Sequence, residues 1–178
     1  MAILSEIKMN NNLENHVIFR EGRSDDDLSL SELENLCVPE ADAATLDTFK
    51  KRLEKYKDQF IVAELDGKVI GVVNGPVTME ADLTDEMYAD TNYHVENGQW
   101  KMIFGVDTHP DFRGQHIASR SMERTIEKAR AEGRKGLVLT CKENLIGFYE
   151  RFGFVNEGIS GSEHGGALWY QMRLQFEK

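Results

Sequence analysis

The chain has 178 residues, of which 40% are hydrophobic, and that length is sufficient for one domain with a substantial core. Its 31 Asp and Glu residues outnumber its 21 Lys and Arg residues, for a formal net charge of −10, which argues against nucleic-acid binding because phosphate contacts need a basic surface. A small cationic molecule suits this charge better, although an acidic composition is also common in ordinary soluble proteins.

The amino-terminal part of the chain predicts a strand and two helices. Residues 1–15 are polar and rich in Asn, so we expect a flexible segment there and a single domain over 16–178. A strand is expected over 16–21, and Ser29 with Glu32 forms a capping box that predicts a short helix beginning at Ser29. A second helix is predicted over 46–56, because apolar side chains recur there at spacings of three and four.

The middle of the chain predicts a hairpin followed by a long loop. Two β-rich runs, 60–65 and 68–73, are joined by Asp66 and Gly67, a dipeptide that favours a type I′ turn. Residues 76–99 contain several acidic residues but no Lys or Arg, and we expect an acidic loop there with one helical turn. Loops of this length in compact domains are more often functional than idle.

The carboxyl-terminal part alternates strands and helices. A strand over 102–107 precedes a helix that ends at Gly133, a buried strand over 136–141 and a short helix over 143–151. Residues 154–155 and an alternating apolar pattern over 168–174 complete the sheet. This order, after an antiparallel start, predicts an α+β fold with a mixed sheet and a right-handed crossover.

Several classes of site and location are not expected. Cys37 and Cys141 are isolated, so they form neither a disulfide framework nor a zinc motif, and a cytoplasmic location is the natural interpretation. No apolar run approaches the roughly 20 residues that span a bilayer, and we expect no membrane association. The five histidines show no HExxH pairing, so we expect no metal.

One segment has the features of an anion site. Residues 106–119, Val-Asp-Thr-His-Pro-Asp-Phe-Arg-Gly-Gln-His-Ile-Ala-Ser, place a glycine-bearing loop between a strand and the first turn of a helix. Unpaired amides and the helix dipole at such a position favour a phosphate, although many helices begin in this way and bind nothing.

This segment resembles the coenzyme A pyrophosphate loop of the GNAT superfamily of acetyltransferases. The pattern of that loop is Arg or Gln, two residues, Gly, any residue, and then Gly or Ala. Arg113 and Ala118 match its ends, and His116 stands where the pattern has its central glycine. The resemblance implies that acetyl-coenzyme A is bound as co-substrate by Val106, Asp107, Thr108, Arg113, Gly114, Gln115, His116, Ile117, Ala118 and Ser119.

A second motif follows about 30 residues later. The run Asn-Leu-Ile-Gly-Phe-Tyr-Glu-Arg-Phe-Gly-Phe over 144–154 resembles the superfamily's other recurrent motif, in which the Asn and the aromatic pair lie along the cofactor. The resemblance therefore implies cofactor contacts from Asn144 and Phe148. It places Tyr149 near the thioester sulfur as the general acid that protonates the departing thiolate. From the residues alone, a half-buried aromatic that packs on the sheet would be the preferred interpretation of Tyr149.

The resemblance also carries expectations about fold, assembly and substrate. It implies a GNAT-like α+β fold with a mixed, mostly antiparallel sheet flanked by helices, and with a splayed central strand pair near Val106. Dimers are common in the superfamily, so a homodimer stays open by analogy. Within the superfamily the chain is similar to the arylalkylamine (serotonin) N-acetyltransferase branch, on residues 91–98 and 148–154. Met102 and Phe104 stand where that branch has two relay histidines.

The proton acceptor and the acceptor substrate stay open at this stage. His94 in the acidic loop is the first candidate for the general base, and His164 or water acting through Glu80 or Glu96 are alternatives. The leading expectation is transfer of acetyl to a small cationic amine by direct attack on the thioester. A protein amino group as acceptor and a catalytically silent acyl-CoA-binding domain are the alternatives.

Overall fold

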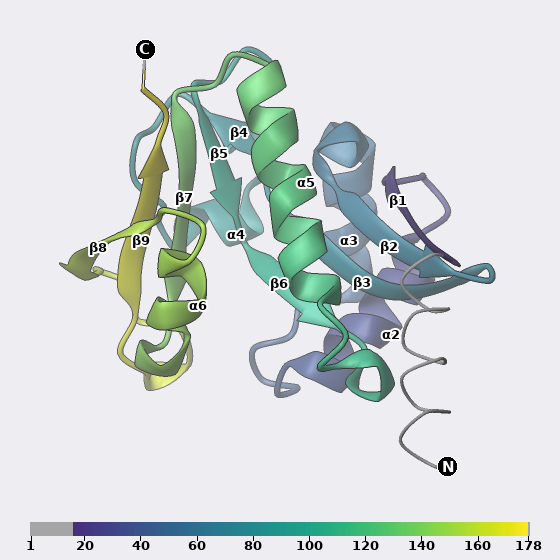
Figure 1. Ribbon diagram of the computed structural model, residues 1–178. Coiled ribbons are helices and arrows are strands. Elements are labelled where there is room, and N and C mark those ends of the chain that lie inside the picture. The colour runs from purple at the N-terminus through teal and green to yellow at the C-terminus, as the bar shows by residue number, and fades with distance from the viewer. Residues whose placement is uncertain (1–15, 178) are drawn as a thin grey trace.

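The computed structural model describes residues 16–177 and forms two sheets that diverge from a common centre (Figure 1). The first sheet has the order β1-β2-β3-β6, and the second has the order β4-β5-β7-β9-β8. Every strand pair is antiparallel except β5 with β7. This is the mixed, mostly antiparallel arrangement that was predicted.

The first half of the chain builds the first sheet and the two helices that cover it. β1 (Val17–Glu21), β2 (Ile61–Leu65) and β3 (Lys68–Asn74) are consecutive neighbours in this sheet, with α2 (Asp27–Cys37) and α3 (Leu46–Tyr56) inserted after β1. The turn between β2 and β3 is formed by Asp66 and Gly67, whose φ angles of 49° and 80° are both positive, as a type I′ turn requires. The predicted hairpin is therefore confirmed.

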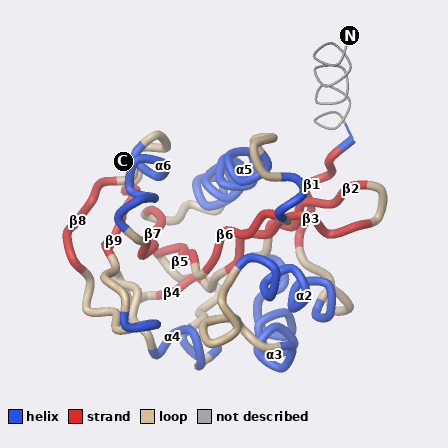
Figure 2. Tube along the Cα trace, turned by 90° about the horizontal axis from the view of Figure 1, so that it is seen from below, coloured by secondary structure: helices blue, strands red, loops and turns tan. Residues whose placement is uncertain are grey.

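The second half adds a crossover and the second sheet. Its elements are β4 (Val77–Thr78), α4 (Glu86–Ala89), β5 (Trp100–Ile103), β6 (Gly105–Thr108), α5 (Ile117–Ala131), β7 (Gly136–Cys141), α6 (Ile146–Glu150), β8 (Val155–Ile159) and β9 (Tyr170–Gln175). Figure 2 shows α5 and α6 on one face of the sheets, with α2, α3 and α4 on the other. Apolar side chains of α5 and β7, with Met172 of β9, form one continuous buried cluster.

Three details differ from the sequence-based expectation. α2 begins at Asp27, so Ser29 lies inside the helix; the turn before it is held by Asp26, whose carboxylate accepts hydrogen bonds from the Arg23 amide and the Arg20 guanidinium. The strand expected over 102–107 is divided at Phe104, because the chain there leaves one sheet and joins the other. The long acidic loop includes a short strand, β4, as well as the helical turn α4.

Candidate active site

The division of one strand into β5 and β6 opens the sheet at its centre. β5 pairs in parallel with β7 as far as Ile103 and Leu139, whereas β6 pairs only with β3 among the strands of residues 16–177. The carboxyl-terminal end of β7 and the free edge of β6 therefore separate after Phe104. Because backbone N–H groups alternate in direction along a strand, the amides of β6 that point away from β3 face this opening without a strand partner.

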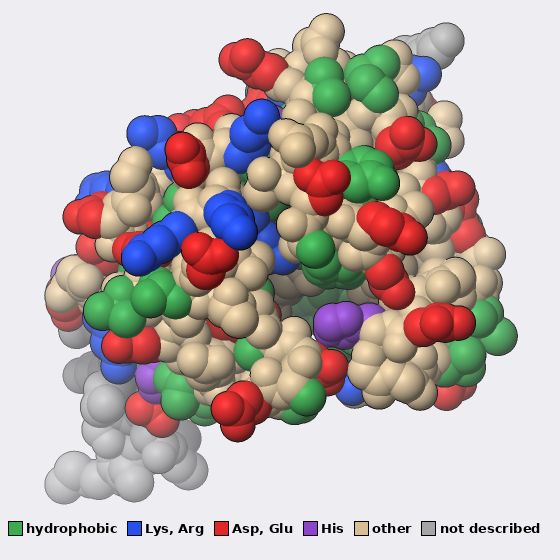
Figure 3. All heavy atoms as spheres, turned by 180° about the vertical axis from the view of Figure 1, so that it is seen from behind, with side chains coloured by type: hydrophobic (Ala, Val, Ile, Leu, Met, Phe, Trp, Pro, Cys, Tyr) green, Lys and Arg blue, Asp and Glu red, His purple; other side chains and the backbone are tan. Residues whose placement is uncertain are grey.

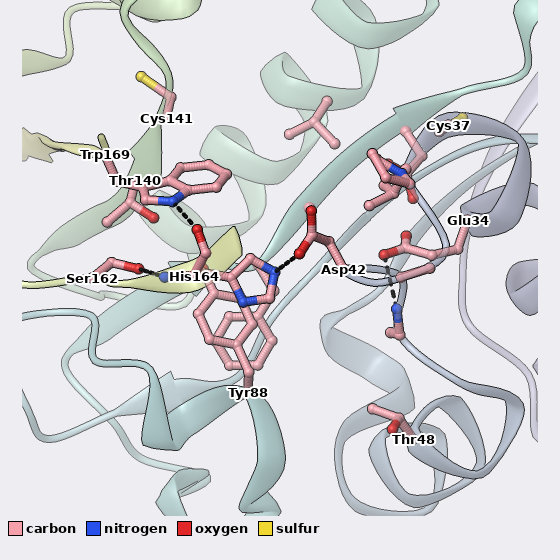
Figure 4. A pocket seen from close by; sticks show the side chains of 18 of the residues that line it. Glu34, Cys37, Asp42, Thr48, Tyr88, Thr140, Cys141, Ser162, His164 and Trp169 are labelled. Carbon is pink, nitrogen blue, oxygen red and sulfur yellow. Dashed lines mark hydrogen bonds and ion pairs between the residues drawn. The ribbon is translucent and has the colours of Figure 1, made fainter. Parts of the chain in front are cut away.

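A cavity of about 520 Å³ occupies the opening. Its walls come from the loop between α2 and α3, the free edge of β6, the end of β7, α6, and the loop that precedes β9. Figure 4 shows side chains from opposite walls that point toward one another across it. On the outer surface, Figure 3 shows a hollow with acidic side chains along part of its rim.

Tyr149 lines this cavity from α6 and is 7% exposed. Phe148 packs edge-on against it, with ring centroids 5.0 Å apart, and Phe154 packs against it at 5.9 Å. Burial raises the pKa of the Tyr149 phenol, and the nearby Cys141 and Asp107 raise it further. The hydroxyl is therefore protonated at neutral pH.

A carboxyl pair lines the opposite wall. Asp107 of β6 and Glu34 of α2 are 6% and 9% exposed, and their carboxyl groups are close enough to interact electrostatically. Burial and the adjacent Glu34 raise the pKa of Asp107 well above its ordinary value. Both residues line the cavity that Tyr149 faces.

Two loops meet at a third side of the cavity. His164 Nε2, from the loop before β9, lies 3.7 Å from Asp42 Oδ1, from the loop between α2 and α3 (Figure 4). The His164 ring stacks on Tyr88 at 5.8 Å, and Tyr88 in turn stacks on Phe104 at 4.4 Å. This contact joins two walls of the cavity that are distant in sequence.

The amino-terminal end of α5 lies at the carboxyl end of β6, as the anion-site interpretation requires. The first hydrogen bond of the helix runs from the Arg120 amide to His116 O at 3.0 Å, so the amides of Ile117, Ala118 and Ser119 have no partner inside the helix. His116 and Gly114 have φ angles of 62° and 78°, in the left-handed region. The loop thus keeps a backbone shape suited to glycine even where it carries histidine, and its free amides fit a pyrophosphate.

The remaining cofactor candidates occupy different surroundings. Arg113, Gly114 and Gln115 lie in the loop before α5, whereas the Ile117 side chain is 3% exposed and packs in the core. Thr108 lies at the end of β6 and accepts a hydrogen bond from the Cys37 thiol at 3.2 Å through its carbonyl. Asn144 is exposed in the short turn before α6, a helix that lies on the same face of the sheets as α5 (Figure 2).

His94 lies apart from the cavity that contains Tyr149. Its ring contacts Tyr56, its Nδ1 accepts a hydrogen bond from the Val77 amide at 3.2 Å, and it lines a different hollow between α3 and the end of α5. Burial lowers the pKa of His94 to about 4. Glu96 lines that second hollow as well, whereas His164 lines the cavity with Tyr149.

The acidic loop contributes to the cavity in an unexpected way. The lining residues that come from it are Tyr88 and Ala89, both without negative charge. Asp85 instead accepts hydrogen bonds from Ser162 Oγ at 2.6 Å and from the Glu163 amide at 3.0 Å, and so holds the loop that carries His164. Within residues 16–177, no group of three His, Cys, Asp or Glu side chains is placed to hold a metal, and no helix is long and apolar enough to cross a membrane.

Comparison with known proteins identifies the family. The model of the acetyltransferase (GNAT) family matches residues 28–154, which is more than half of the chain. The chain belongs to the GNAT family. An uncharacterised N-acetyltransferase of Methanocaldococcus jannaschii is 29% identical over 116 residues, which cover 62% of this chain and 45% of that relative. The chain therefore spans less than half of the length of this relative.

Two solved structures share the fold of this GNAT chain at low sequence identity. The loading GNATL domain of CurA from Lyngbya majuscula has a TM-score of 0.77 at 15% identity, covering 89% of this chain and 97% of that domain. A GNAT family acetyltransferase from Brucella melitensis, solved in complex with acetyl-CoA, has a TM-score of 0.60 at 18% identity, covering 92% of this chain and 90% of that chain.

Sequence reasoning found part of the cavity and missed the rest. It named Tyr149, Asp107 and Val106, which all line the cavity. It missed Glu34 and Asp42, which belong to α2 and to the loop after it, where no motif marks them. An acidic residue beside a predicted helix end is too common a feature to have indicated a site.

Proposed function

We propose that this GNAT protein is an acetyl-CoA-dependent N-acetyltransferase that transfers acetyl to a small primary amine. The observation that carries the proposal is the opening between β6 and β7. It places the phenol of Tyr149 and the free backbone edge of β6 on the walls of one cavity. A proton donor and N–H donors are the two features that acyl transfer from a thioester needs.

Each wall has a role in this reaction. Acetyl-CoA supplies the acetyl group as a thioester and leaves as coenzyme A. The free amides at the start of α5 bind its pyrophosphate, with Asn144 and Phe148 along the cofactor. Backbone N–H groups near Val106 stabilise the negative charge that develops on the thioester oxygen, and Tyr149 donates its proton to the departing sulfur.

The cavity favours a small cationic acceptor over a protein chain. Glu34, Asp42 and Asp107 are three acidic residues among its lining, and they attract an ammonium group. The contact between His164 and Asp42 bridges two walls of the cavity, which obstructs the path that an extended peptide would take along it. His94 has no place in this proposal, because it lines a different hollow.

Two measurements test the proposal. Acetyl-CoA should raise the thermal midpoint, because a ligand that binds only the folded state stabilises it by about 2.7 kcal/mol at a hundredfold excess over its dissociation constant. Release of free coenzyme A thiol should then depend on an added amine, in a panel that includes 2-phenylethylamine, 1,4-diaminobutane and lysine-containing peptides. Binding of acetyl-CoA without turnover of any amine would contradict the proposal and favour a silent acyl-CoA-binding domain.

The His116→Gly variant tests the pyrophosphate loop separately. Glycine adopts the φ of 62° without strain, so the loop should keep its shape. Tighter acetyl-CoA binding in this variant would show that the imidazole obstructs the phosphates. Weaker binding would show that the imidazole is itself a ligand.

A further inference from the structure

The carboxyl pair on the cavity wall has an oxygen that the surrounding protein leaves without a hydrogen-bond donor. Asp107 Oδ2 is buried, and no hydrogen-bond donor reaches it from the residues that the structure describes. Glu34 Oε1 accepts a hydrogen bond from the Ala44 amide at 3.3 Å (Figure 4). Two ionised carboxylates placed so close repel one another, which favours a state in which the two groups share one proton and carry a single negative charge.

No cation of the described chain neutralises this charge by direct contact. Arg52 of α3 donates to Asn74 Oδ1 and to Tyr88 O, each at 3.1 Å. Arg113 lies near the Cys37 thiol. The titratable and charged groups that face the pair are Arg113 before α5, Arg52 of α3, Cys37 of α2 and Tyr149 of α6.

The pair and the phenol lie on the same cavity. The Asp107 carboxyl and the Tyr149 hydroxyl are close enough to influence one another electrostatically, and both line the space that opens between β6 and β7. An amine placed between them would contact a carboxylate on one side and lie beside the proton donor on the other. That position suits the attacking nitrogen.

Resting on the proposed function, we propose that the Glu34–Asp107 pair binds the ammonium group of the acceptor and takes its proton. The ammonium replaces the shared proton, which is released to solvent, because the two positive charges compete for the same pair of carboxylates. One N–H proton of the bound ammonium then returns to the pair and leaves a neutral amine.

The remaining steps balance in atoms and charge. The amine lone pair forms a bond to the acetyl carbon, and the carbon–sulfur bond breaks as the sulfur takes the proton of the Tyr149 hydroxyl. The second N–H proton restores the phenol, and the third stays on the amide product. In total, one ammonium and one thioester give one amide, one thiol and the proton released on binding.

The protonation of the pair can be measured without any substrate. In protein labelled with ¹³C at the Asp and Glu side-chain carboxyls, we expect one resonance of the pair to titrate well above the ordinary range of carboxyl groups. The Asp107→Asn and Glu34→Gln variants should each remove this late titration. Ordinary titration of both carboxyls would overturn the proposal.

Binding of an amine provides a second readout that a purely structural pair would not change. Calorimetry with 2-phenylethylamine and 1,4-diaminobutane, in buffers of different ionisation enthalpy, measures protons released on binding. We expect release of up to one proton from wild type near neutral pH and none from Asp107→Asn. Equal release from both proteins, or binding without release in wild type, would contradict the proposal.

Kinetic measurements distinguish the role of the Glu34–Asp107 pair from the proposed acetyltransferase activity. For the panel amine that wild type acetylates fastest, kcat/KM should fall by about 10²- to 10⁴-fold in Asp107→Asn and Glu34→Gln, the range for a lost proton acceptor. Glu32→Gln, at an exposed position on the same helix as Glu34, is the matched control and should match wild type. The thermal shift by acetyl-CoA should be equal in all four proteins.

The outcomes are distinguishable. If wild type acetylates an amine, and both pair variants have a kcat/KM within twofold of wild type and an unchanged pH profile, the role of the pair is rejected. The proposed function is then left intact. A wild type that binds acetyl-CoA and acetylates no amine would reject the proposed function itself. Circular dichroism of the variants checks their fold, which neutral side chains of equal size should preserve.

Discussion

The strand from Trp100 to Thr108 carries a buried ionisable side chain in each of its two halves. In β5, Lys101 is 2% exposed, and its Nζ donates to the carbonyl oxygens of Gln59 and Gly75, each at 2.6 Å. In β6, Asp107 is 6% exposed and has an oxygen with no donor in the described chain. The two residues are six positions apart in one extended segment.

Strand pairing accounts for the difference. β5 has neighbours on both edges, β4 and β7, and the space around Lys101 is filled by protein. β6 has a neighbour on one edge only, and a cavity lies along the other. Burial alone therefore does not indicate a functional group; a buried charge whose hydrogen bonds are incomplete beside a cavity does.

The largest expected effect comes from Tyr149, which lines the cavity beside the free edge of β6. Tyr149→Phe removes one hydroxyl and keeps the ring, so the fold and cofactor affinity should persist while kcat falls by about 10²- to 10⁴-fold. KM should change much less, because the proton is donated only in the transition state. Single-turnover kinetics checks the change.

Tyr56→Phe is the matched control, because Tyr56 is a buried tyrosine of α3 that does not line the cavity. We expect its rate to equal that of wild type. A Tyr149→Phe rate within twofold of wild type would mean that the phenol is a packing residue and that the thiolate leaves without it.

Substitution of Lys101 in β5 should instead lower stability and leave the rate of acetyl transfer unchanged. Lys101→Met leaves the carbonyl groups of Gln59 and Gly75 without their donor, which should lower the free energy of unfolding by about 1–3 kcal/mol. The rate of acetyl transfer should stay unchanged, because the side chain does not line the cavity. Urea denaturation and the thiol-release assay measure the two quantities. A large loss of rate in a folded Lys101→Met protein would contradict the view that Lys101 contributes only to stability.

The contributions of Lys101 and Asp107 to the free energy of unfolding should also change in opposite directions with pH. The pKa of Lys101 is lowered to about 7 by burial, so the folded protein binds fewer protons than the unfolded chain between about pH 7 and the ordinary lysine value. This contribution to stability increases as pH rises through that window. The pKa of Asp107 is raised by burial and by Glu34, so its contribution decreases as pH rises above the ordinary value of an aspartate.

Thermal or urea unfolding across pH separates these contributions. Asp107→Asn should lose the contribution to stability that decreases as pH rises. Lys101→Met should lose the contribution to stability that increases as pH rises. Identical pH profiles in wild type and both variants would show that neither group titrates differently in the folded state.

The smallest expected effect belongs to His94. His94→Asn keeps a side-chain acceptor within reach of the Val77 amide and leaves the cavity untouched, so kcat/KM and its pH profile should stay within twofold of wild type. The measurement is thiol release across pH with the fastest amine of the panel. A loss of the pH-dependent limb would restore His94 as the proton acceptor.

Much of the fold was predictable, because local patterns carry it. Asp66 and Gly67 specify a type I′ hairpin, and the apolar spacing from Leu46 to Tyr56 specifies a helix with one buried face. The expected start of α2 was wrong because Asp26, held by Arg20 and by the Arg23 amide, sets the turn before the helix. Such side-chain contacts across elements are invisible to a local pattern.

By itself, the sequence determined the order of the elements, the glycine-suited loop before α5 and the position of Tyr149 in its motif. Only the tertiary structure decided at which residue the strand divides, that His94 and His164 line different spaces, and that Glu34 lies beside Asp107. The physical reason is that periodicity and turn chemistry act between residues a few positions apart. The pairing of two carboxyl groups 73 residues apart depends instead on how α2 packs beside the free edge of β6.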